Sequence, residues 1–180
     1  SSSSHSITES GNVTSSAFTP YHSGGYSAYF DGTGDYLTIE SPYSDVGSSA
    51  DFTGEAWIYI DAGYTQTNPL VFSSNSSGLN FGLISSSGYK LYVGHSYVGN
   101  VVSGTTTINL ATWYHIAVVR NNGTLKTYIN GVEESSLANT SNFIGTTNYI
   151  GSIPALGSSY NWKGYLKDVR FVKGTAVYTS

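Results

Sequence analysis

Residues 113–131, which read WYHIAVVRNNGTLKTYING, carry the strongest evidence for the fold class. Side chains in the first half of this stretch alternate with period two, and Tyr, Thr, Val and Ile dominate it, as they do in β-strands. Both faces of residues 113–120 are largely apolar, which predicts a central strand that is covered on two sides. The pairs Asn122-Gly123 and Asn130-Gly131 follow, and Asn-Gly is the strongest short hairpin signal. The stretch therefore predicts antiparallel strands joined by tight turns.

Shorter alternating runs occupy much of the chain on either side of this stretch. Turn signals recur about every 8 to 12 residues, a spacing typical of a sandwich or a barrel. No run shows the helical period of about 3.6 residues, and no repeat of about 20 to 50 residues indicates a propeller or solenoid. We therefore predict an all-β, antiparallel domain. The alternating runs are residues 26–30, 35–40, 55–60, 79–84, 89–93, 113–120, 125–130 and 165–172.

Composition excludes several other classes of protein. Charged residues make up only 10% of the 180 residues, too few for a coiled coil or helix bundle, and 14% aromatics argue against a disordered acidic tail. The net charge is −4 and the cations are scattered, which argues against a nucleic-acid partner. Cysteine is absent, so disulfides and thiolate zinc sites are excluded. No apolar stretch approaches the roughly 18 residues that a membrane span needs.

The chain divides into two parts by composition. Residues 1–25 are rich in Ser, Thr and Gly, which predicts a linker or a short edge strand. Residues 26–180 are then expected to form a single domain, because β-sandwiches of about 200 residues commonly do so. The Ser1–Ser4 start without methionine predicts a piece cut from a longer protein.

Five motifs resemble, in their order along the chain, the landmark strands of laminin G-like, concanavalin A-like jelly-roll domains. Each motif is weak alone, but the five together span nearly the whole chain. The resemblance implies an antiparallel two-sheet jelly-roll sandwich. Residues 172–178 are also similar to laminin G-like modules in bacteriophage structural proteins. The motifs are FDGTGDYL at 30–37, FTGEAWI at 52–58, WYHIAVVR at 113–120, LKTYING at 125–131 and WKGYLKDVR at 162–170.

The superfamily contains both binding proteins and enzymes, so catalysis must be sought in the residues themselves. Its sandwich hydrolases carry a pattern like E-x-D-x-x-E on one strand, which places acid and nucleophile about 5 Å apart. None of the 11 acidic residues forms that pattern, and the adjacent Glu133 and Glu134 would point to opposite faces of a strand. Serine-hydrolase and metalloprotease motifs are also absent. His115 is interpreted as a core histidine, and we predict that the chain is not an enzyme.

The resemblance also implies a structural calcium ion, which family members often hold where the first and last strands meet. Asp168 matches a family ligand position, Gly54 matches a glycine that contributes its carbonyl, and Asp31 is a further candidate. Calcium prefers such oxygen ligands, and binding only the folded state would add stability. Alternatively, Asp31 is a turn residue and Asp168 pairs with Lys167 or Arg170.

A glycan-binding site is the second functional expectation. Sugars bind against aromatic faces, with amide and hydroxyl groups meeting the sugar hydroxyls, and 16 Tyr, 3 Trp and many Asn suit that chemistry. Trp57, Trp113 and Trp162 fall on predicted strands and are interpreted as core residues. The candidates on predicted loops are Tyr64, Asn75, Tyr97, Asn100, Tyr160 and Asn161.

These observations favour a non-catalytic binding or adhesion module of a larger extracellular or virion-surface protein. Its expected partner is a polysaccharide or cell-surface glycan. The alternative is a structural decoration or spacer domain that contacts copies of itself or neighbouring virion or surface proteins. A surface with few charges and many tyrosines suits both hypotheses.

Overall fold

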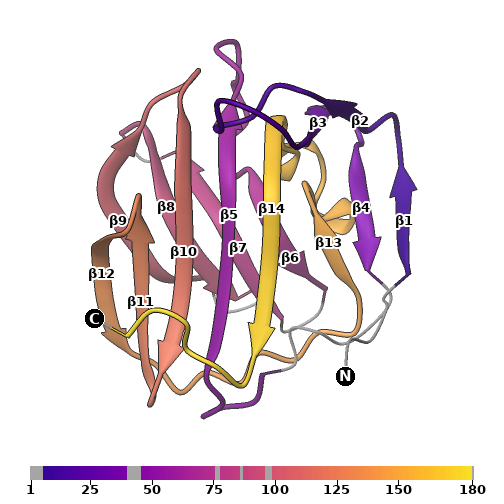
Figure 1. Cartoon of the computed structure of the whole chain (residues 1–180). Helices are drawn as coiled ribbons and strands as arrows, with labels where there is room; N and C mark the ends of the chain where they lie inside the picture. The colour runs from indigo at the N-terminus through magenta and orange to yellow at the C-terminus, as the bar shows by residue number, and fades with distance from the viewer. Residues whose placement is uncertain (1–5, 40–45, 76–77, 86, 96–98, 180) are drawn as a thin grey trace.

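The computed structural model of the chain describes residues 6–39, 46–75, 78–85, 87–95 and 99–179. These residues form two seven-stranded antiparallel sheets that stack face to face (Figure 1). The prediction of an all-β, two-sheet jelly-roll sandwich is confirmed. Helix in the described part of the chain is limited to the short turns η1 (Pro154–Leu156) and η2 (Ser158–Tyr160), neither of which could cross a membrane.

The sheet nearer the viewer in Figure 1 is termed the front sheet, and its strand order is β12-β11-β10-β5-β14-β3-β2. Its central strands β10, β5 and β14 come from distant parts of the chain and carry the site described below. The strands are β2 (Thr14–Ser16), β3 (Ser27–Asp31), β5 (Phe52–Ile60), β10 (Trp113–Asn121), β11 (Thr124–Ile129), β12 (Val132–Ala138) and β14 (Lys163–Lys173).

The back sheet has the order β1-β4-β13-β6-β7-β8-β9. Its inner face packs against the inner face of the front sheet, and the hydrophobic core lies between them. Trp162 is fully buried in this core, as its interpretation from the sequence requires. The strands are β1 (Ile7–Ser10), β4 (Tyr36–Ile39), β6 (Leu70–Ser74), β7 (Leu79–Ser85), β8 (Tyr89–His95), β9 (Gly99–Ile108) and β13 (Asn148–Ile150).

Both Asn-Gly pairs are two-residue turns, as the sequence predicts. Asn122-Gly123 joins β10 to β11, and Asn130-Gly131 joins β11 to β12. All four residues have left-handed φ angles, of 47°, 75°, 50° and 79° in chain order. Two successive left-handed residues match the twist of antiparallel strands, which is why Asn and Gly stand here.

Residues 1–25, for which a linker or a short edge strand is expected, supply strands to both sheets. β1 pairs with β4 at the edge of the back sheet, and β2 pairs with β3 at the edge of the front sheet. The chain crosses from the back sheet to the front sheet between β1 and β2. The buried Asp35 carboxylate fixes this crossing, because it accepts the N–H groups of Asn12 and Asp31, each at 2.8 Å. A Cβ atom on Gly11 would lie 2.2 Å from Asp35 Oδ1, so glycine is needed at the crossing.

Glu134 joins the two sheets at the other side of the sandwich, where β12 lies beside β9. Its Oε1 atom accepts the N–H groups of Thr105 and Thr106, the latter at 2.7 Å, and the Thr105 hydroxyl at 2.8 Å. Gly104 permits this approach, since a Cβ there would lie 2.8 Å from Glu134 Cγ. The carboxylate thus covers part of an edge strand, which would otherwise offer its N–H groups to other chains.

The stability that Glu134 contributes is expected to fall in acid. Burial alone would raise its pKa, but the hydrogen bonds from Thr106 and Thr105 outweigh burial and lower the pKa to about 2. The folded-state pKa is therefore below the unfolded value of about 4.3, so the stabilisation is present above that pH and disappears as the pH falls through 2. Glu134→Gln should lower the free energy of unfolding by about 1–3 kcal/mol at pH 7 and by clearly less at pH 3.

Urea unfolding of both proteins at the two pH values measures this effect. Glu133→Gln is the matched control, because Glu133 is exposed and pairs with Lys126, at 2.8 Å on the surface. The control should change stability little at either pH. An equal loss for Glu134→Gln at pH 7 and pH 3 would contradict the assigned role of the carboxylate.

Candidate functional site

The outer face of the front sheet carries aromatic and charged side chains on adjacent strands. In β5, Ala56 and Ile58 belong to the core, so Glu55 and Trp57 point outward. His115 of β10 stands directly opposite Trp57, and the two rings lie 5.3 Å apart. Asp168 and Arg170 of β14 lie on the other side of β5. The front-face site is defined as Tyr21, Glu55, Trp57, His115, Asp168 and Arg170.

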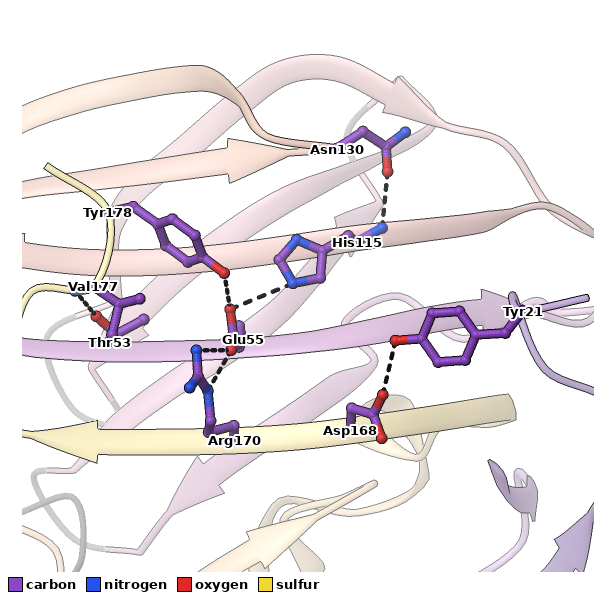
Figure 2. A network of polar contacts seen from close by, with 9 residues as sticks. All are labelled: Tyr21, Thr53, Glu55, His115, Asn130, Asp168, Arg170, Val177 and Tyr178. Carbon is purple, nitrogen blue, oxygen red and sulfur yellow. Dashed lines mark hydrogen bonds and ion pairs between the residues drawn. The ribbon is translucent and has the colours of Figure 1, made fainter. Parts of the chain in front are cut away.

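Glu55 is the centre of a polar network on this face (Figure 2). One carboxylate oxygen accepts both Nε and Nη2 of Arg170, and the other accepts the Tyr178 hydroxyl. The Nε2 atom of His115 lies 3.4 Å from the second oxygen. The Glu55 side chain is only 9% exposed, whereas that of Arg170 is 51% exposed. Glu55 therefore orients a guanidinium group that remains open to a ligand.

The electrostatics of this network keep its donors protonated. The hydrogen bond to Glu55 raises the pKa of Arg170 above its ordinary value. Burial, together with the same carboxylate, raises the pKa of the Tyr178 hydroxyl. Both groups donate hydrogen bonds to Glu55, and the raised pKa values keep them protonated to a higher pH than usual.

Asp168 reaches the outer face through a β-bulge. The register of β14 against β5 shifts between Lys167 and Arg170, and Asp168 has a left-handed φ of 49°. Bulges re-aim side chains, and Asp is among the residues that tolerate this conformation. Its Oδ2 accepts the Tyr21 hydroxyl at 2.9 Å, and Lys167 Nζ lies 3.3 Å from Oδ1. The Asp168 side chain is 54% exposed, so the bulge presents an oriented carboxylate to solvent.

A packed aromatic cluster supports the segment that carries Tyr21. Phe18 contacts the rings of Tyr59, Trp113 and Tyr165, with centroid distances of 4.8, 5.5 and 4.9 Å. Residues 17–26 cross the front sheet on this cluster, near the top of Figure 1. The Tyr21 ring then meets Trp57 edge-on at 5.9 Å. The N-terminal segment thus forms one wall of the front-face site.

Three of the predicted glycan contacts have structural roles. Tyr64 is 4% exposed and donates its hydroxyl to the Asn161 carbonyl at 2.6 Å, and burial raises its pKa. Asn161 is 7% exposed, and its amide donates to the Gly32 carbonyl. The side-chain oxygen of Asn75 accepts the N–H of Thr146 at 3.0 Å. The prediction is corrected for Tyr64 and Asn161, because their side chains are buried, whereas glycan contact by the half-buried Asn75 stays a prediction.

The other three predicted contacts lie away from the front-face site or beyond the described residues. Tyr160 is half-buried in η2 and packs against a small cluster around Leu70 and Ile153. Asn100 lies in β9 of the back sheet, and Tyr97 lies outside the described residues. Glycan contact by Tyr160, Asn100 and Tyr97 stays a prediction.

The three predicted calcium ligands do not come together. Asp31 stands opposite Lys163 at one end of β14, whereas Gly54 stands opposite Phe171, eight residues further along. That separation is roughly 25 Å along a strand, and Asp168 lies between the two. A single ion cannot touch all three, so the predicted ligand set is corrected. The described residues contain no group of three or more histidines or acids that could hold a metal.

Local contacts explain the same three residues without an ion. Asp31 Oδ1 accepts the Thr33 N–H at 2.6 Å, as in an Asx turn. Asp168 pairs with Lys167, which is the alternative considered from the sequence. Gly54 is buried, and a Cβ there would meet the Val118 side chain at 3.2 Å. Close packing against Val118 therefore accounts for a glycine at this position.

Sequence reasoning missed the residues that the structure brings together. Trp57, Trp113 and His115 were expected in the core, but all three are half-buried on the outer face of the front sheet. The available signal was the alternation in β5, where Trp57 shares a face with the charged Glu55. A strand face that carries a charge is more often the wet one.

A two-sheet jelly roll with an aromatic and charged open face defines a lectin-like β-sandwich. The chain belongs to the concanavalin A-like lectin/glucanases superfamily, whose family model matches residues 31–176. A search of curated protein sequences gave no match.

Solved structures share this fold at low sequence identity. Domain 4 of AbnA, an extracellular arabinanase from Geobacillus stearothermophilus solved with arabinotriose, is 20% identical, with a TM-score of 0.65 over 96% of this chain and 84% of that one. The carbohydrate-binding module CBM66 from Bacillus subtilis is 13% identical, with a TM-score of 0.55 over 94% and 95%. A botulinum neurotoxin type C structure, described with two ganglioside molecules, is 18% identical, with a TM-score of 0.67 over 97% and 44%.

Proposed function

We propose that this chain is a non-catalytic carbohydrate-binding module that holds a polysaccharide or cell-surface glycan on the front-face site. The observation that carries the proposal is Trp57, a half-buried indole on the outer face of a sheet with oriented, half-exposed Asp168 and Arg170 beside it. The structural neighbours described with arabinotriose and gangliosides support a glycan ligand.

The chemistry of the face suits a sugar ring. An indole covers the C–H patches of a sugar, while charged side chains donate and accept hydrogen bonds with its hydroxyl groups. Glu55 holds Arg170, and Tyr21 and Lys167 hold Asp168, before any ligand binds. Groups that are already oriented lose little conformational freedom on binding, which favours affinity.

The same contacts support binding without cleavage. A glycosidase needs two carboxyl groups that flank the scissile bond, one to donate a proton and the other to act as nucleophile or base. Glu55 is held by the guanidinium group of Arg170, and its side chain is only 9% exposed. Asp168 is then the open carboxylate of the front-face site.

We further infer an extracellular location, as in the arabinanase whose domain shares the fold. Membership of an adhesin or of a virion-surface protein stays a prediction. The alternative of a decoration or spacer domain would place a protein partner on this face.

Trp57→Ala is expected to weaken glycan binding about thirtyfold or more, because the loss of a central aromatic anchor costs about 2 kcal/mol. A glycan array would identify the ligand, and isothermal titration calorimetry would measure its affinity for both proteins. Tyr36→Ala is the matched control, since Tyr36 is a half-buried aromatic residue of the back sheet that packs edge-on against Tyr149. It should bind like the unaltered chain. A stable homo-oligomer that binds no glycan would instead support the spacer hypothesis.

A further inference from the structure

A cavity of about 120 Å³ adjoins the front-face site. It lies between β10, β11, the Asn130-Gly131 turn and the C-terminal residues. His115 connects the two features, because its ring lines the cavity and also lies beside Trp57. The lining residues are His115, Ala117, Tyr128, Gly131 and Tyr178.

The hydroxyl group of Tyr128 is the unusual feature of this cavity. Tyr128 is 3% exposed, and its hydroxyl oxygen has no hydrogen-bond partner among the described residues. A buried polar group without a partner destabilises a protein, so it calls for an explanation such as a bound molecule. Ala117 and Gly131 offer no side-chain polar group, so much of the cavity wall is apolar, and the buried hydroxyl of the lining residue Tyr128 is an unused donor.

Tyr178 is the lining residue whose side chain can move to admit a ligand. It belongs to residues 174–179, which cross the front of β5, β10 and β11 outside any strand (Figure 1). This segment is held through Thr53, whose hydroxyl accepts the Val177 N–H at 2.8 Å, and through the bond from Tyr178 to Glu55 (Figure 2). A ligand group can therefore reach Tyr128 by moving one ring, without opening the sheet.

We propose that this cavity binds the acetamido group of an N-acetylated sugar whose ring lies on Trp57; the inference rests on the proposed function. A cavity of about 150 Å³ holds benzene, which has six heavy atoms, so 120 Å³ suits the four heavy atoms of an acetamido group. Its methyl group packs on Ala117 and Gly131, and its carbonyl oxygen accepts the Tyr128 hydroxyl.

Two other substituents fit this cavity less well. A simple hydroxyl group would leave most of the volume empty and the apolar wall uncovered. A carboxylate would bring a negative charge next to Glu55, whose cationic partner Arg170 is already paired. Shape, polarity and charge together select the acetamido group.

The test compares chitotetraose with cellotetraose, which has the same linkage but a hydroxyl in place of each acetamido group. Titration calorimetry should show at least tenfold tighter binding of chitotetraose. Tyr128→Phe removes only the hydroxyl and should weaken chitotetraose binding about tenfold, while cellotetraose binding stays unchanged. Its melting temperature should be unchanged or higher, since the unpaired polar group is gone. Ala117→Val, which fills the cavity, should cause the same selective loss.

The outcomes separate the two proposals. Equal affinity for the two oligosaccharides, or no effect of Tyr128→Phe, overturns the cavity assignment and leaves the proposed function standing. Binding of neither oligosaccharide, together with Trp57-dependent binding of a glycan that carries no acetamido group, also overturns the cavity assignment and leaves the proposed function standing. The absence of any glycan binding overturns both proposals.

Discussion

Arg120→Ala is expected to lower the free energy of unfolding by about 3–5 kcal/mol, because it leaves a void in the core and leaves four backbone carbonyl groups of two loops without their donor. Arg120 is fully buried, and its guanidinium group lies 5.2 and 5.5 Å from the ring centres of Phe52 and Phe143. Burial lowers its pKa from the ordinary value. Alanine would leave a void between two rings and remove donors from buried carbonyl groups. The acceptors of Arg120 are the backbone carbonyls of Val46, Gly47, Ala50 and Ser141.

Chemical denaturation followed by tryptophan fluorescence would measure the loss. Arg120→Lys should be intermediate, since an ammonium group cannot reproduce the planar fork of donors. Lys126→Ala is the control, because Lys126 pairs with Glu133 at the surface and should contribute little. A loss below about 1 kcal/mol for Arg120→Ala would show that the carbonyls find other donors or water.

Gly164→Ala is expected to prevent β14 from pairing as it does, with a loss above about 4 kcal/mol or failure to fold. A Cβ atom at this position would lie 2.1 Å from the carbonyl oxygen of Tyr59 in the neighbouring strand. The φ angle of Gly164 is also +132°, which side chains rarely tolerate. Because β14 carries Asp168 and Arg170, the front-face site should be lost with the pairing. Thermal unfolding and circular dichroism measure the effect.

Gly157→Ala is the control that separates the effect of the steric clash at Gly164 from the effect of backbone strain. Gly157 has φ of +87°, but a Cβ atom placed there would meet no other atom within 4 Å. The substitution should therefore cost only the backbone strain of a non-glycine residue at φ +87° and ψ −175°, about 1–3 kcal/mol. Similar losses for Gly157→Ala and Gly164→Ala would show that β14 can shift to accept the extra atom.

The strands and their turns were predictable because their causes are local. Alternation along residues 113–120 follows from the two-residue period of a strand, and Asn130-Gly131 follows from the left-handed turn between two strands. The family resemblance added the stacking of two sheets. Neither step required knowledge of which distant segments meet.

The candidate site was not predictable in the same way. Composition indicated glycan contacts on loops, yet Tyr64 and Asn161 are buried because those loops pack against the core. Conversely, Trp57 and His115 lie within strands of largely apolar sequence, which sequence reasoning assigns to the interior. Burial depends on which face of the sheet lies against the other sheet, and residue type alone decides that poorly.

Sequence patterns and the family resemblance were sufficient to predict an antiparallel jelly-roll sandwich, its Asn-Gly hairpins and the lack of a hydrolase-type run of acids. Tertiary structure decided where a ligand can bind. Tyr21 meets Asp168 across 147 residues, and Tyr178 meets Glu55 across 123. Strand pairing places β5 between β10 and β14, and residues 17–26 and 174–179 fold back over that face. Such contacts depend on the register of whole strands, which no short stretch of sequence encodes.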